Sequence, residues 1–579
     1  MAVIGIDLGT TNSLAAYWKD GEARLIPDET GSVLVPSVVS FQEGEGLSVG
    51  QQAKERRMLD ETAAVGSFKR FMGTEKTYQL GQKNYTPMQL SAMVLEKMKR
   101  NAECYLKEEI TEAIITVPAY FNDKQRSDTK KAAQIAGLPV ERLINEPSAA
   151  ALAYRMQYGE EDKSLLIFDF GGGTLDLSYV ECFENIIEIV AVAGDNYLGG
   201  DDIDRLIAEY FCRECGVAQQ RLTAEERAAL WKTAEAAKRQ LEQEPEVKMT
   251  VEIAGESCSA SLNEEILFEI CTSLFAKIRE LFLHILEDAG SGISDVDDLI
   301  MVGGSSRLSV VKRFLRELLG KEPIVLGNTD QVVAMGAGAY AGIRQRKEEI
   351  RDLLMTDVCP FTLGVETHHR QSDENGYMLP MIERNSTLPA SRCERLFTLD
   401  DYQKAVTIKI YQGEEYYAKD NLYLGEVTVK VPQKKAGKEW VDVYFTYDIN
   451  GILQVEAVNA KGERNRILLA NQSLSKAELA RCQKELEQIL FPPIQQEKNQ
   501  EMLRKLTTYY EQSTGERRQQ IGALIDWFTS GLNSGRLHVR KKVTEEMERQ
   551  LALLEEFEGR KAEIFFDGEL KQEKEREEL

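Results

Sequence analysis

Two stretches of this chain share one pattern of apolar and polar positions: an apolar strand, an aspartate, a glycine-containing turn and a second, alternating strand. The first stretch, VIGIDLGTTNSLAAYW, places Asp7 just before the turn at residues 9–11. The second, LLIFDFGGGTLDLSYV, places Asp169 before the turn at residues 171–174. An apolar run before a glycine turn and period-two alternation after it predict β-hairpins. The separation of about 160 residues between the two copies indicates two related lobes.

The three successive glycines of the second hairpin suggest a ligand as well as a turn. Residues without a Cβ atom let backbone amides approach a ligand closely, and phosphate is well suited to such amides. Two of these hairpins facing each other across a cleft would clamp the β- and γ-phosphates of one nucleotide. Their carboxylates would then call for Mg²⁺ between them and the phosphates. An ordinary glycine-rich turn is the alternative, and the absence of a G-x-x-x-x-G-K-[ST] sequence excludes a P-loop enzyme.

A third glycine signal lies in DLIMVGGSSRLSVVKRFL, which predicts a buried strand, a turn at Gly303-Gly304 and a helix. The amides of this turn would approach a nucleotide sugar or phosphate, and Arg307 would lie flat on an adenine. Loop geometry alone is the alternative. Two further segments, INEPSAAALAY and AMGAGAYAGI, are predicted helices of small residues that permit a close crossing, and we interpret them as a hinge between the lobes.

The pattern changes in the second half of the chain. From Val358 to Leu469 it has period two, and WVDVYFTYDINGILQVEAV alternates on both sides of a turn at Asn450-Gly451. Several strands of this kind predict a β-sandwich. From Ser473 onward the pattern is helical, with a break at Pro492-Pro493, and predicts an amphipathic helical lid. A coiled-coil or scaffold segment is the alternative for this last part.

Composition narrows the classes of function. A chain of 579 residues with 43% hydrophobic and 29% charged residues has material for several globular domains. Its net charge of -24 opposes non-specific binding to nucleic acid or to an anionic membrane. We expect a cytoplasmic protein, because the sequence has no apolar run of about 20 residues and no signal-peptide pattern. Nine scattered cysteines suit a reducing compartment, and the pair Cys212 and Cys215 is expected to be idle or buried thiols.

Six motifs resemble, in this order, the DnaK-type seventy-kilodalton heat-shock chaperones: IGIDLGTTNS, ITVPAYFNDKQR, INEPSAAALAY, FDFGGGTLDLS, LGGDDID and MVGGSSR. The resemblance continues through RDLLMTDVCPFTLGVET, IERNSTLPASR, AVTIKIYQGE and FTYDINGILQVEA. The sequences MTDVCPFTLGVE and YDINGILQVEA and the short C-terminal region look most like those of the HscC branch. The resemblance implies an α/β actin-like two-lobed ATPase domain over residues 1–347, a linker over 348–357, a β-sandwich substrate-binding domain over 358–470 and a helical lid over 471–579.

For the ATPase domain, the resemblance implies hydrolysis of ATP to ADP and phosphate with Mg²⁺, and potassium is a further candidate ion. Positioning and charge stabilisation carry most of the catalysis in phosphoryl transfer. The implied catalytic residues are Lys69, Glu146, Asp169, Thr174 and Asp176, and Asp7 and Asp169 would hold the metal mainly through water. The implied nucleotide-binding residues are Asp7, Gly9, Thr10, Thr11, Asn12, Gly171, Gly172, Gly173, Gly199, Gly200, Glu235, Lys238, Arg239, Gly303, Gly304, Ser305, Arg307 and Asp330.

Pattern alone interprets several of these residues differently. It makes Lys69 a surface lysine, and it makes Glu146 an ordinary carboxylate at a helix N-terminus. On the predicted helix AEAAKRQLEQ, it places the implied adenosine contacts on an exposed face. The family usually has serine at the position of Glu242, so that nucleoside contact is expected to differ in this chain.

For the second half, the resemblance implies a sandwich that grips extended apolar segments of unfolded polypeptide clients. The implied peptide-binding residues are Val365, Thr367, Phe397, Val406 and Ile408, with core packing as the alternative. His368 stands where a methionine is common, and the loop TLDDYQKAV is one residue short, so the peptide preference is expected to differ. Residues implied in coupling between the domains are Pro118, Arg126, Arg142, Asp352, Leu353, Leu354 and Asp357.

The function expected from these observations is an ATP-driven peptide-binding chaperone. A J-domain co-chaperone would contact Arg142 and Asp357, and a nucleotide-exchange factor is a further expected partner. A metabolic kinase on the same two-lobed architecture and an actin-like filament protein are the alternatives. Both would end after the nucleotide domain, so the predicted sandwich weighs against them.

Overall fold

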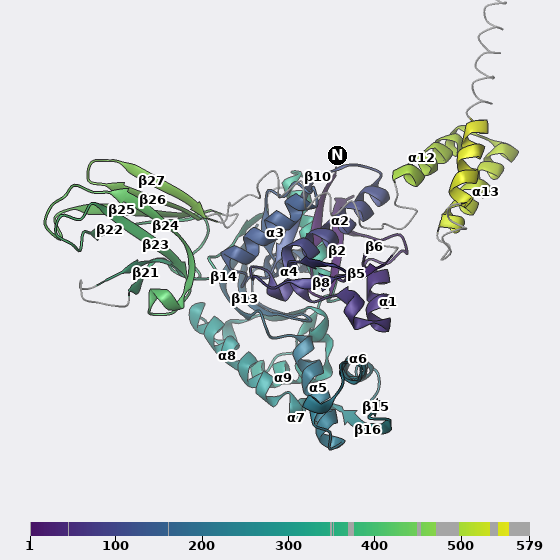
Figure 1. The fold of residues 1–579 in the computed structure, drawn as a ribbon, viewed down its shortest axis with the longest axis horizontal. Helices are drawn as coiled ribbons and strands as arrows, with labels where there is room; N and C mark the ends of the chain where they lie inside the picture. The colour runs from purple at the N-terminus through teal and green to yellow at the C-terminus, as the bar shows by residue number, and fades with distance from the viewer. Residues whose placement is uncertain are drawn as a thin grey trace, which may run out of the picture. The chain divides into compact units, whose positions relative to one another are not determined.

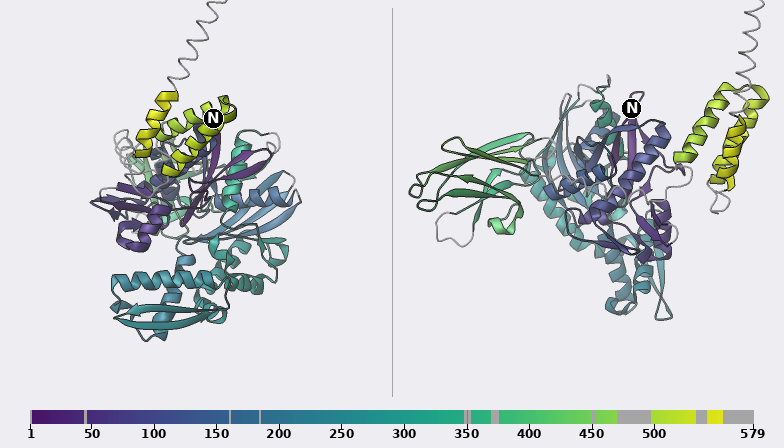
Figure 2. Two further views of the ribbon diagram at one scale, coloured as in Figure 1. Left: turned by 90° about the vertical axis from the view of Figure 1, so that its right-hand side faces the viewer. Right: turned by 45° about the horizontal axis from the view of Figure 1, so that its top comes forward.

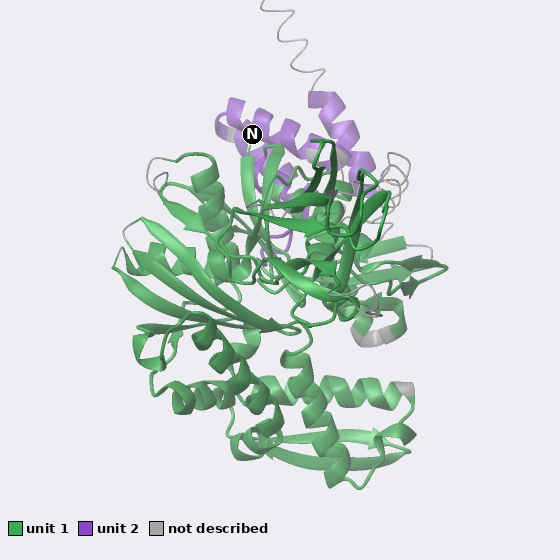
Figure 3. Ribbon diagram, turned by 90° about the vertical axis from the view of Figure 1, so that its left-hand side faces the viewer, with its two compact units in different colours: residues 1–27, 33–102, 108–489 green, residues 28–32, 103–107, 490–579 purple. Residues whose placement is uncertain are grey.

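The structure is a computed structural model, and it describes residues 2–43, 46–159, 161–183, 185–347, 350, 353–368, 376–448, 453–469, 497–532 and 542–554. The chain forms two compact units, which Figure 3 distinguishes by colour. The first unit comprises residues 1–27, 33–102 and 108–489, and the second comprises residues 28–32, 103–107 and 490–579. The first unit contains both central sheets and the sandwich (Figures 1 and 2).

Two six-stranded sheets with related topology form the base of the first unit. The first has the order β11 (Leu143–Asn145), β10 (Ile110–Val117), β1 (Ala2–Asp7), β2 (Asn12–Lys19) and β3 (Glu22–Ile26), and β4 (Val35–Pro36) also pairs with β2. The second has the order β18 (Ile324–Val325), β17 (Asp298–Val302), β12 (Lys163–Phe170), β13 (Leu175–Phe183), β14 (Ile186–Asp195) and β19 (Leu354–Thr356). Each sheet is an antiparallel three-stranded meander extended by parallel strands, which confirms the predicted duplication.

The two hairpins that define the duplication form as predicted. In the first, β1 and β2 pair in antiparallel register, with Asp7 opposite Leu14. In the second, Phe170 pairs with Leu175 and Asp169 pairs with Asp176. The glycine turn between the two strands is therefore four residues long. Each strand has an aspartate, Asp169 or Asp176, one position away from its end at the turn. The third glycine signal also follows a strand, but a 3₁₀ turn over Gly304–Arg307 separates that strand from α9 (Ser309–Leu319).

The two helices of small residues pack against each other as expected. Helix α10 (Val332–Arg344) lies on β1, β2 and β3 of the first sheet, and α4 (Glu146–Tyr158) packs against β12, β13 and β14 of the second. A Cβ atom added to Gly336 would overlap the carbonyl group of Ala149, so the backbones of the two helices are in direct contact. Each helix thus packs on one of the two sheets. Their crossing joins the two lobes, as expected for a hinge.

The remaining elements of the two lobes surround these sheets (Figure 1). The helices are α1 (Gln51–Leu59), α2 (Pro87–Leu106), α3 (Asp123–Ile135), α5 (Gly200–Glu214), α6 (Ala224–Gln240), α7 (Glu264–Ile270) and α8 (Thr272–Asp288). The smaller sheets are β6 (Gly46–Val49) with β5 (Val39–Gln42) and β7 (Ala64–Val65), β8 (Tyr78–Leu80) with β9 (Lys83–Tyr85), and β15 (Glu246–Ile253) with β16 (Glu256–Asn263).

The predicted sandwich is confirmed. One sheet has the order β21 (Tyr377–Ile382), β20 (Leu363–Thr367), β23 (Ala405–Gln412) and β24 (Leu422–Lys430), and the other has the order β22 (Ala390–Phe397), β25 (Trp440–Tyr447), β26 (Leu453–Asn459) and β27 (Arg464–Leu469). Alternate residues of β25, Val441, Val443 and Phe445, are buried between them. Strands β25 and β26 form the expected hairpin, although its turn at Asn450-Gly451 lies outside the described residues.

The second unit is helical and has a hydrophobic core of its own. It contains α12 (Glu497–Gln512), α13 (Gly515–Leu532) and a helix over residues 542–554. Leu506, Phe528 and Met547 are fully or almost fully buried among these helices. The prediction of helices in this region is confirmed, whereas Pro492-Pro493 and the tail lie outside the described residues. Among the described helices, none is long and apolar enough to span a membrane.

The contact between α4 and α10 generates a first prediction. In Gly336→Ala, the new methyl group must displace the backbone of Ala149, and we expect the free energy of unfolding of the ATPase lobes to fall by about 2 kcal/mol, the cost typical of overpacking. Urea titration followed by far-UV circular dichroism measures the change. Gly292→Ala is the matched control, because a Cβ atom there would make only ordinary contacts of 3.4 and 3.5 Å. Equal stability of the two variants would contradict the assigned close crossing.

Candidate functional site

The two glycine turns meet face to face. A Cβ atom added to Gly173 would lie 2.9 Å from the side-chain methyl group of Thr10, and one added to Gly172 would overlap the hydroxyl group of Thr11. The turn of the first lobe and the turn of the second therefore touch across the space between the sheets. This is the facing arrangement that the duplicated hairpins predict, and only residues without a Cβ atom allow it.

A buried lysine lies beside these turns. Lys69, on a 3₁₀ helix over Phe68–Phe71, has a side chain that is 5% exposed and an Nζ atom 2.6 Å from Oε1 of Glu146. Glu146 is also buried, at the start of α4. The interpretation of Lys69 as a surface lysine is wrong, because the fold brings together two charges that are 77 residues apart in the chain.

Three aspartates surround this ion pair. The hydroxyl group of Thr116 donates to Oδ1 of Asp7 at 3.1 Å, and the backbone amide of Tyr120 donates to Oδ1 of Asp176 at 3.1 Å. Burial and the charge of Glu146 raise the pKa of Asp7 to about 7 and the pKa of Asp176 to about 7. The same two causes, together with Asp176 and Asp7, hold the pKa of Asp169 well above its ordinary value. Four carboxylates thus share one ammonium group.

This donor set fits a divalent cation with an anionic ligand. If the four carboxyl groups are ionised, Lys69 balances only one of their charges, and burial makes the remainder costly. Within the described part of the chain, no cluster of three or more side chains has the arrangement of a direct metal site. Mg²⁺ keeps several of its waters when it binds, so carboxylates at this spacing suit a hydrated ion held through water. That Asp7 and Asp169 hold the ion mainly through water stays a prediction.

Hydrogen bonds to its carbonyl groups hold the turn Gly171–Thr174 in place. The carbonyl oxygen of Gly171 accepts hydrogen bonds from the amide of Gly200 at 3.0 Å and from the hydroxyl group of Ser305 at 2.8 Å. The carbonyl oxygen of Gly172 accepts from the amide of Asp201 at 2.8 Å. The predicted residues at Gly199–Gly200 and Gly303–Ser305 therefore converge on the turn. These hydrogen bonds to its carbonyl groups fix the conformation of the turn.

The predicted nucleoside-binding residues fall into two groups. On α6, the ammonium group of Lys238 donates to the carbonyl oxygen of Gly200 at 3.0 Å and pairs with Asp204, while Glu235 and Arg239 form an exposed pair at 2.6 Å. Arg307, the last residue of the 3₁₀ turn, donates to Asn328 and Thr329 and pairs with Asp330. Lys238 thus ties α6 to the N-terminal end of α5, and Arg307 is fixed by a neighbouring loop. Asn12 begins β2, beside the first turn.

Residues predicted to couple the domains form a chain of buried contacts. Arg126 donates to Oδ1 of Asn145 at 2.7 Å, and hydrogen bonds from Ser148, at 3.2 Å, and Asn145 reach the carboxylate of Asp357. Burial raises the pKa of Asp357 despite these hydrogen bonds. Pro118 is buried just before α3 and accepts from the amide of Phe121. Arg142 instead donates to the hydroxyl group of Tyr340.

Within the linker, the described residues Leu354–Thr356 form a strand. Strand β19 pairs in parallel with β14, with Leu354 opposite Ile186 and Met355 opposite Ile187. Leu353 and Met355 pack against the core between the two sheets, whereas Leu354 is 61% exposed. The described part of the linker is therefore docked on the second sheet. Asp352 lies outside the described residues.

The sandwich contacts the lobes through residues that the sequence analysis did not identify. The hydroxyl group of Tyr447 donates to Oδ1 of Asp123 at 2.9 Å, and the amide of Asp123 donates to Gln412 at 3.2 Å. Asp288 accepts from Arg384 at 2.7 Å and from Asn385 at 2.9 Å. These residues are unremarkable in the sequence, and only their contacts with residues 96 to 324 positions away reveal them.

The predicted peptide-binding residues differ in accessibility. Val365 and Ile408 are buried in the core of the sandwich, in line with the core-packing alternative. Val406 shares the strand face of Ile408 and is partly buried, and Thr367 is also partly exposed. Phe397 is 54% exposed at the end of β22. Leu399 and Tyr402, which the sequence analysis did not select, are also exposed in the loop after it.

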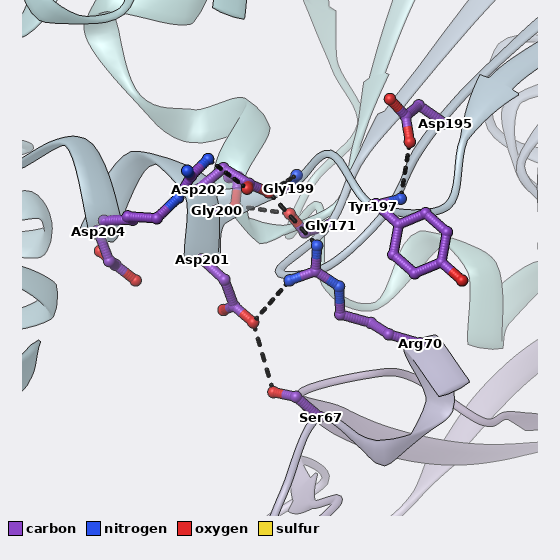
Figure 4. Close-up of polar contacts among 12 residues, drawn as sticks. Ser67, Arg70, Gly171, Asp195, Tyr197, Gly199, Gly200, Asp201, Asp202 and Asp204 are labelled. Atoms are coloured by element: carbon purple, nitrogen blue, oxygen red, sulfur yellow. Dashed lines mark hydrogen bonds and ion pairs between the residues drawn. The ribbon is translucent and has the colours of Figure 1, made fainter. Parts of the chain in front are cut away.

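A further residue that the sequence analysis missed is Arg70. Its side chain lies against the Cα atom of Gly173, and its guanidinium group extends to Asp201 at 3.4 Å and Asp202 at 3.5 Å (Figure 4). Ser67 adds a contact to Asp201 at 3.5 Å. Arg70 belongs to the first lobe, and both aspartates belong to the first turn of α5 in the second lobe. These contacts therefore bridge the lobes directly over the glycine turn.

Comparisons with known proteins agree with the motifs. A family model described as "Hsp70 protein" matches residues 3–564. Proteins named "Chaperone protein DnaK" from Thermotoga petrophila, Thermotoga sp. strain RQ2 and Thermotoga maritima are each 39% identical to this chain over 495 residues. Each alignment covers 83% of this chain and 82% of the relative.

The bridge made by Arg70 generates a prediction about ligand release. Removing it in Arg70→Ala should let the lobes part more readily, and we expect a fluorescent ADP analogue to dissociate about 10-fold faster, a change equivalent to about 1.4 kcal/mol. Stopped-flow displacement by excess ADP measures this rate. Arg205→Ala is the matched control, because Arg205 contacts the same Asp202 at 3.1 Å from within α5 and crosses no boundary between lobes. Similar release rates in both variants would contradict the bridging role.

The buried carboxylates generate a prediction about pH. The pKa of Asp176 is raised to about 7 in the folded protein, so the folded state keeps a proton that the unfolded state loses near pH 4. The contribution of Asp176 to stability therefore falls as pH rises from about 4 to about 7. In Asp176→Asn without ligand, we expect this slope to weaken by up to about 1.4 kcal/mol per pH unit, measured by urea unfolding at a series of pH values. The exposed residue Glu280 provides the control, and Glu280→Gln should leave the slope unchanged.

Proposed function

The chain belongs to the Hsp70 family, and we propose that its lobes, its linker strand and its sandwich form one coupled cycle in which Mg-ATP opens the peptide site and hydrolysis closes it. As a member of this family, the protein is an ATPase coupled to substrate binding and release, and it acts as an ATP-dependent chaperone. The metabolic kinase and the actin-like filament protein are thereby excluded. The family binds ATP or ADP with Mg²⁺, and the charge arrangement around Lys69 fits that pair of ligands.

The observation that carries the proposed coupling is strand β19. It completes the same sheet that holds Asp169 and Asp176, two strands away from β13. A movement of the second lobe relative to the first therefore reaches the linker through hydrogen-bonded strands, without an intervening loop. Asp357, directly after the linker strand, is held by Ser148 near the start of α4, the helix that begins with Glu146.

We propose the following roles for the residues of the site. Mg²⁺ would supply charge neutralisation for the phosphates, and Asp7 and Asp169 would hold it mainly through water. Lys69, fixed by Glu146, would direct its ammonium group at the transferred phosphate and the attacking water. Asp176 would help to orient that water, and Thr10, Thr11 and Thr174 would contact phosphate or metal shells. Potassium is proposed as an additional ion.

The peptide site is proposed at the end of the sandwich where β22 leads into the loop 398–404. Phe397, Leu399 and Tyr402 expose apolar surface there, and a strand-recognition site needs such anchors for alternate side chains of an extended peptide. Thr367 and Val406 would extend the surface, while Val365 and Ile408 would support it from the core. The clients are therefore proposed to be extended apolar segments of unfolded polypeptides.

The proposal also covers the branch of the family, the location, the partners and the domain boundaries. We place the chain in the HscC branch on the wording of its linker and sandwich motifs, and we place its activity in a bacterial cytoplasm. A J-domain co-chaperone would bind near Arg142 and Asp357, and a nucleotide-exchange factor would act on the second lobe. The domain boundaries proposed from the sequence remain 1–347, 348–357, 358–470 and 471–579.

The proposed cycle predicts how a bound peptide responds to nucleotide. Mg-ATP should accelerate release of a fluorescent extended apolar peptide at least 10-fold, and the linker should be required for this acceleration. Met355 packs against the core whereas its neighbour Leu354 is exposed, so these residues form a matched pair. We expect Met355→Asp to abolish most of the acceleration and Leu354→Asp to preserve most of it, as measured by fluorescence anisotropy after rapid mixing.

The possible outcomes separate the parts of the proposal. Peptide binding without acceleration by Mg-ATP in the unmodified protein would disprove coupling, although hydrolysis would remain. An equal loss of acceleration in both linker variants would show that the packed face of β19 is not what transmits the signal. Absence of any peptide binding would contradict the proposed client class.

A further inference from the structure

The outer part of the second lobe holds a group of cysteines that the ATPase cycle does not use. Cys212 and Cys215 lie at the C-terminal end of α5, and Cys258 lies on β16. The eight cysteines among the described residues are all free thiols. Cys212 is buried, whereas Cys215 and Cys258 are each partly exposed and pack against the edge of the same hydrophobic core.

The fold directs Cys215 and Cys258 toward each other. Residues of β16 alternate between its two faces, and Cys258 shares the inward face with the buried residues Ala260 and Leu262. Helix α5 packs against this strand, and Cys215 is its C-terminal cap. The Cys215 thiol donates to the carbonyl oxygen of Ser259 at 3.8 Å and also interacts with the side chain of Cys258. The two partly accessible thiols are thus neighbours, although they are 43 positions apart in the chain.

We propose that Cys215 and Cys258 form a reversible disulfide when the protein meets a small disulfide oxidant such as oxidised glutathione. The thiolate of Cys215 attacks one sulfur of the oxidant, which forms a mixed disulfide and releases one molecule of the reduced thiol. The thiolate of Cys258 then attacks the sulfur of Cys215, which forms the internal disulfide and releases the second reduced thiol. Two electrons pass from the protein to the oxidant, and the two thiol protons leave with the reduced products.

Proximity, not reactivity, favours this reaction. Burial raises the pKa of Cys215, so its thiolate is scarce and the first step is slow. The second step is intramolecular, and a preformed neighbour acts at a high effective concentration. Cys258 therefore resolves the mixed disulfide before a second molecule of oxidant arrives. An exposed cysteine such as Cys393 would stop at the mixed disulfide.

The cross-link would close a loop that contains α6. This helix packs between α5 and β15, and its Lys238 donates to Gly200 beside the glycine turn. A bond between the C-terminal end of α5 and β16 would restrain α6 between them. We therefore expect oxidation to raise the melting temperature of the second lobe, because it restricts the unfolded chain.

Peptide mapping tests the proposal on the full-length protein. The protein is incubated with oxidised glutathione, free thiols are blocked with N-ethylmaleimide, and a non-reducing digest is examined by mass spectrometry. We expect one peptide pair joined through Cys215 and Cys258, which dithiothreitol separates. In Cys258→Ser, Cys215 should instead carry glutathione, and Cys393→Ser should leave the cross-link unchanged.

Two results would overturn the proposal. One is complete alkylation of Cys215 and Cys258 under conditions in which Cys393 carries glutathione. The other is a cross-link between Cys212 and Cys215 in place of the proposed pair. Differential scanning fluorimetry gives a second readout: the melting temperature should rise on oxidation in the unmodified protein and in Cys393→Ser, but not in Cys258→Ser or Cys258→Ala. Mapping of the unmodified protein decides the matter even if a variant folds poorly.

Discussion

The cleft depends on one electrostatic constraint, the burial of four carboxyl groups around a single ammonium group. Lys69 pairs with Glu146, and among the described residues Asp7, Asp169 and Asp176 form no ion pair. Taking charges out of water is costly unless they are paired, so the site is poised for a hard cation together with phosphate. Because the carboxylates come from both lobes, ligand binding and the position of the lobes are linked by the same interaction.

The same constraint explains the dense packing of glycines around the turns. Phosphate can approach the backbone only where no Cβ atom intervenes, and the two turns touch at Gly172 and Gly173. Arg70 crosses from the first lobe over this contact to the first turn of α5. The two glycine turns, the arginine that bridges the lobes and the first turn of α5 therefore adjoin one another.

From this site, a continuous route of secondary structure leads to the sandwich. Strands β12, β13, β14 and β19 are neighbours in one sheet, so the strand that carries Asp169 and the linker strand share a hydrogen-bonded framework. The sandwich follows the linker and is held by buried contacts such as that of Tyr447 with Asp123. Such a framework is a physical basis for coupling, because a sheet moves as a unit more readily than a loop does.

Local patterns in the sequence by themselves determined the hairpins, the sandwich strands and the helices of small residues, because alternation and glycine placement act over a few neighbouring residues. The ordered motifs also pointed to Asp7, Asp169 and the glycine turns, which the structure brings together. Only the tertiary structure decided that Lys69 is buried against Glu146, that Arg70 bridges the lobes, and that Cys215 meets Cys258. Each of these contacts joins residues far apart in the chain, and no short pattern encodes a distance that is set by the packing of whole elements.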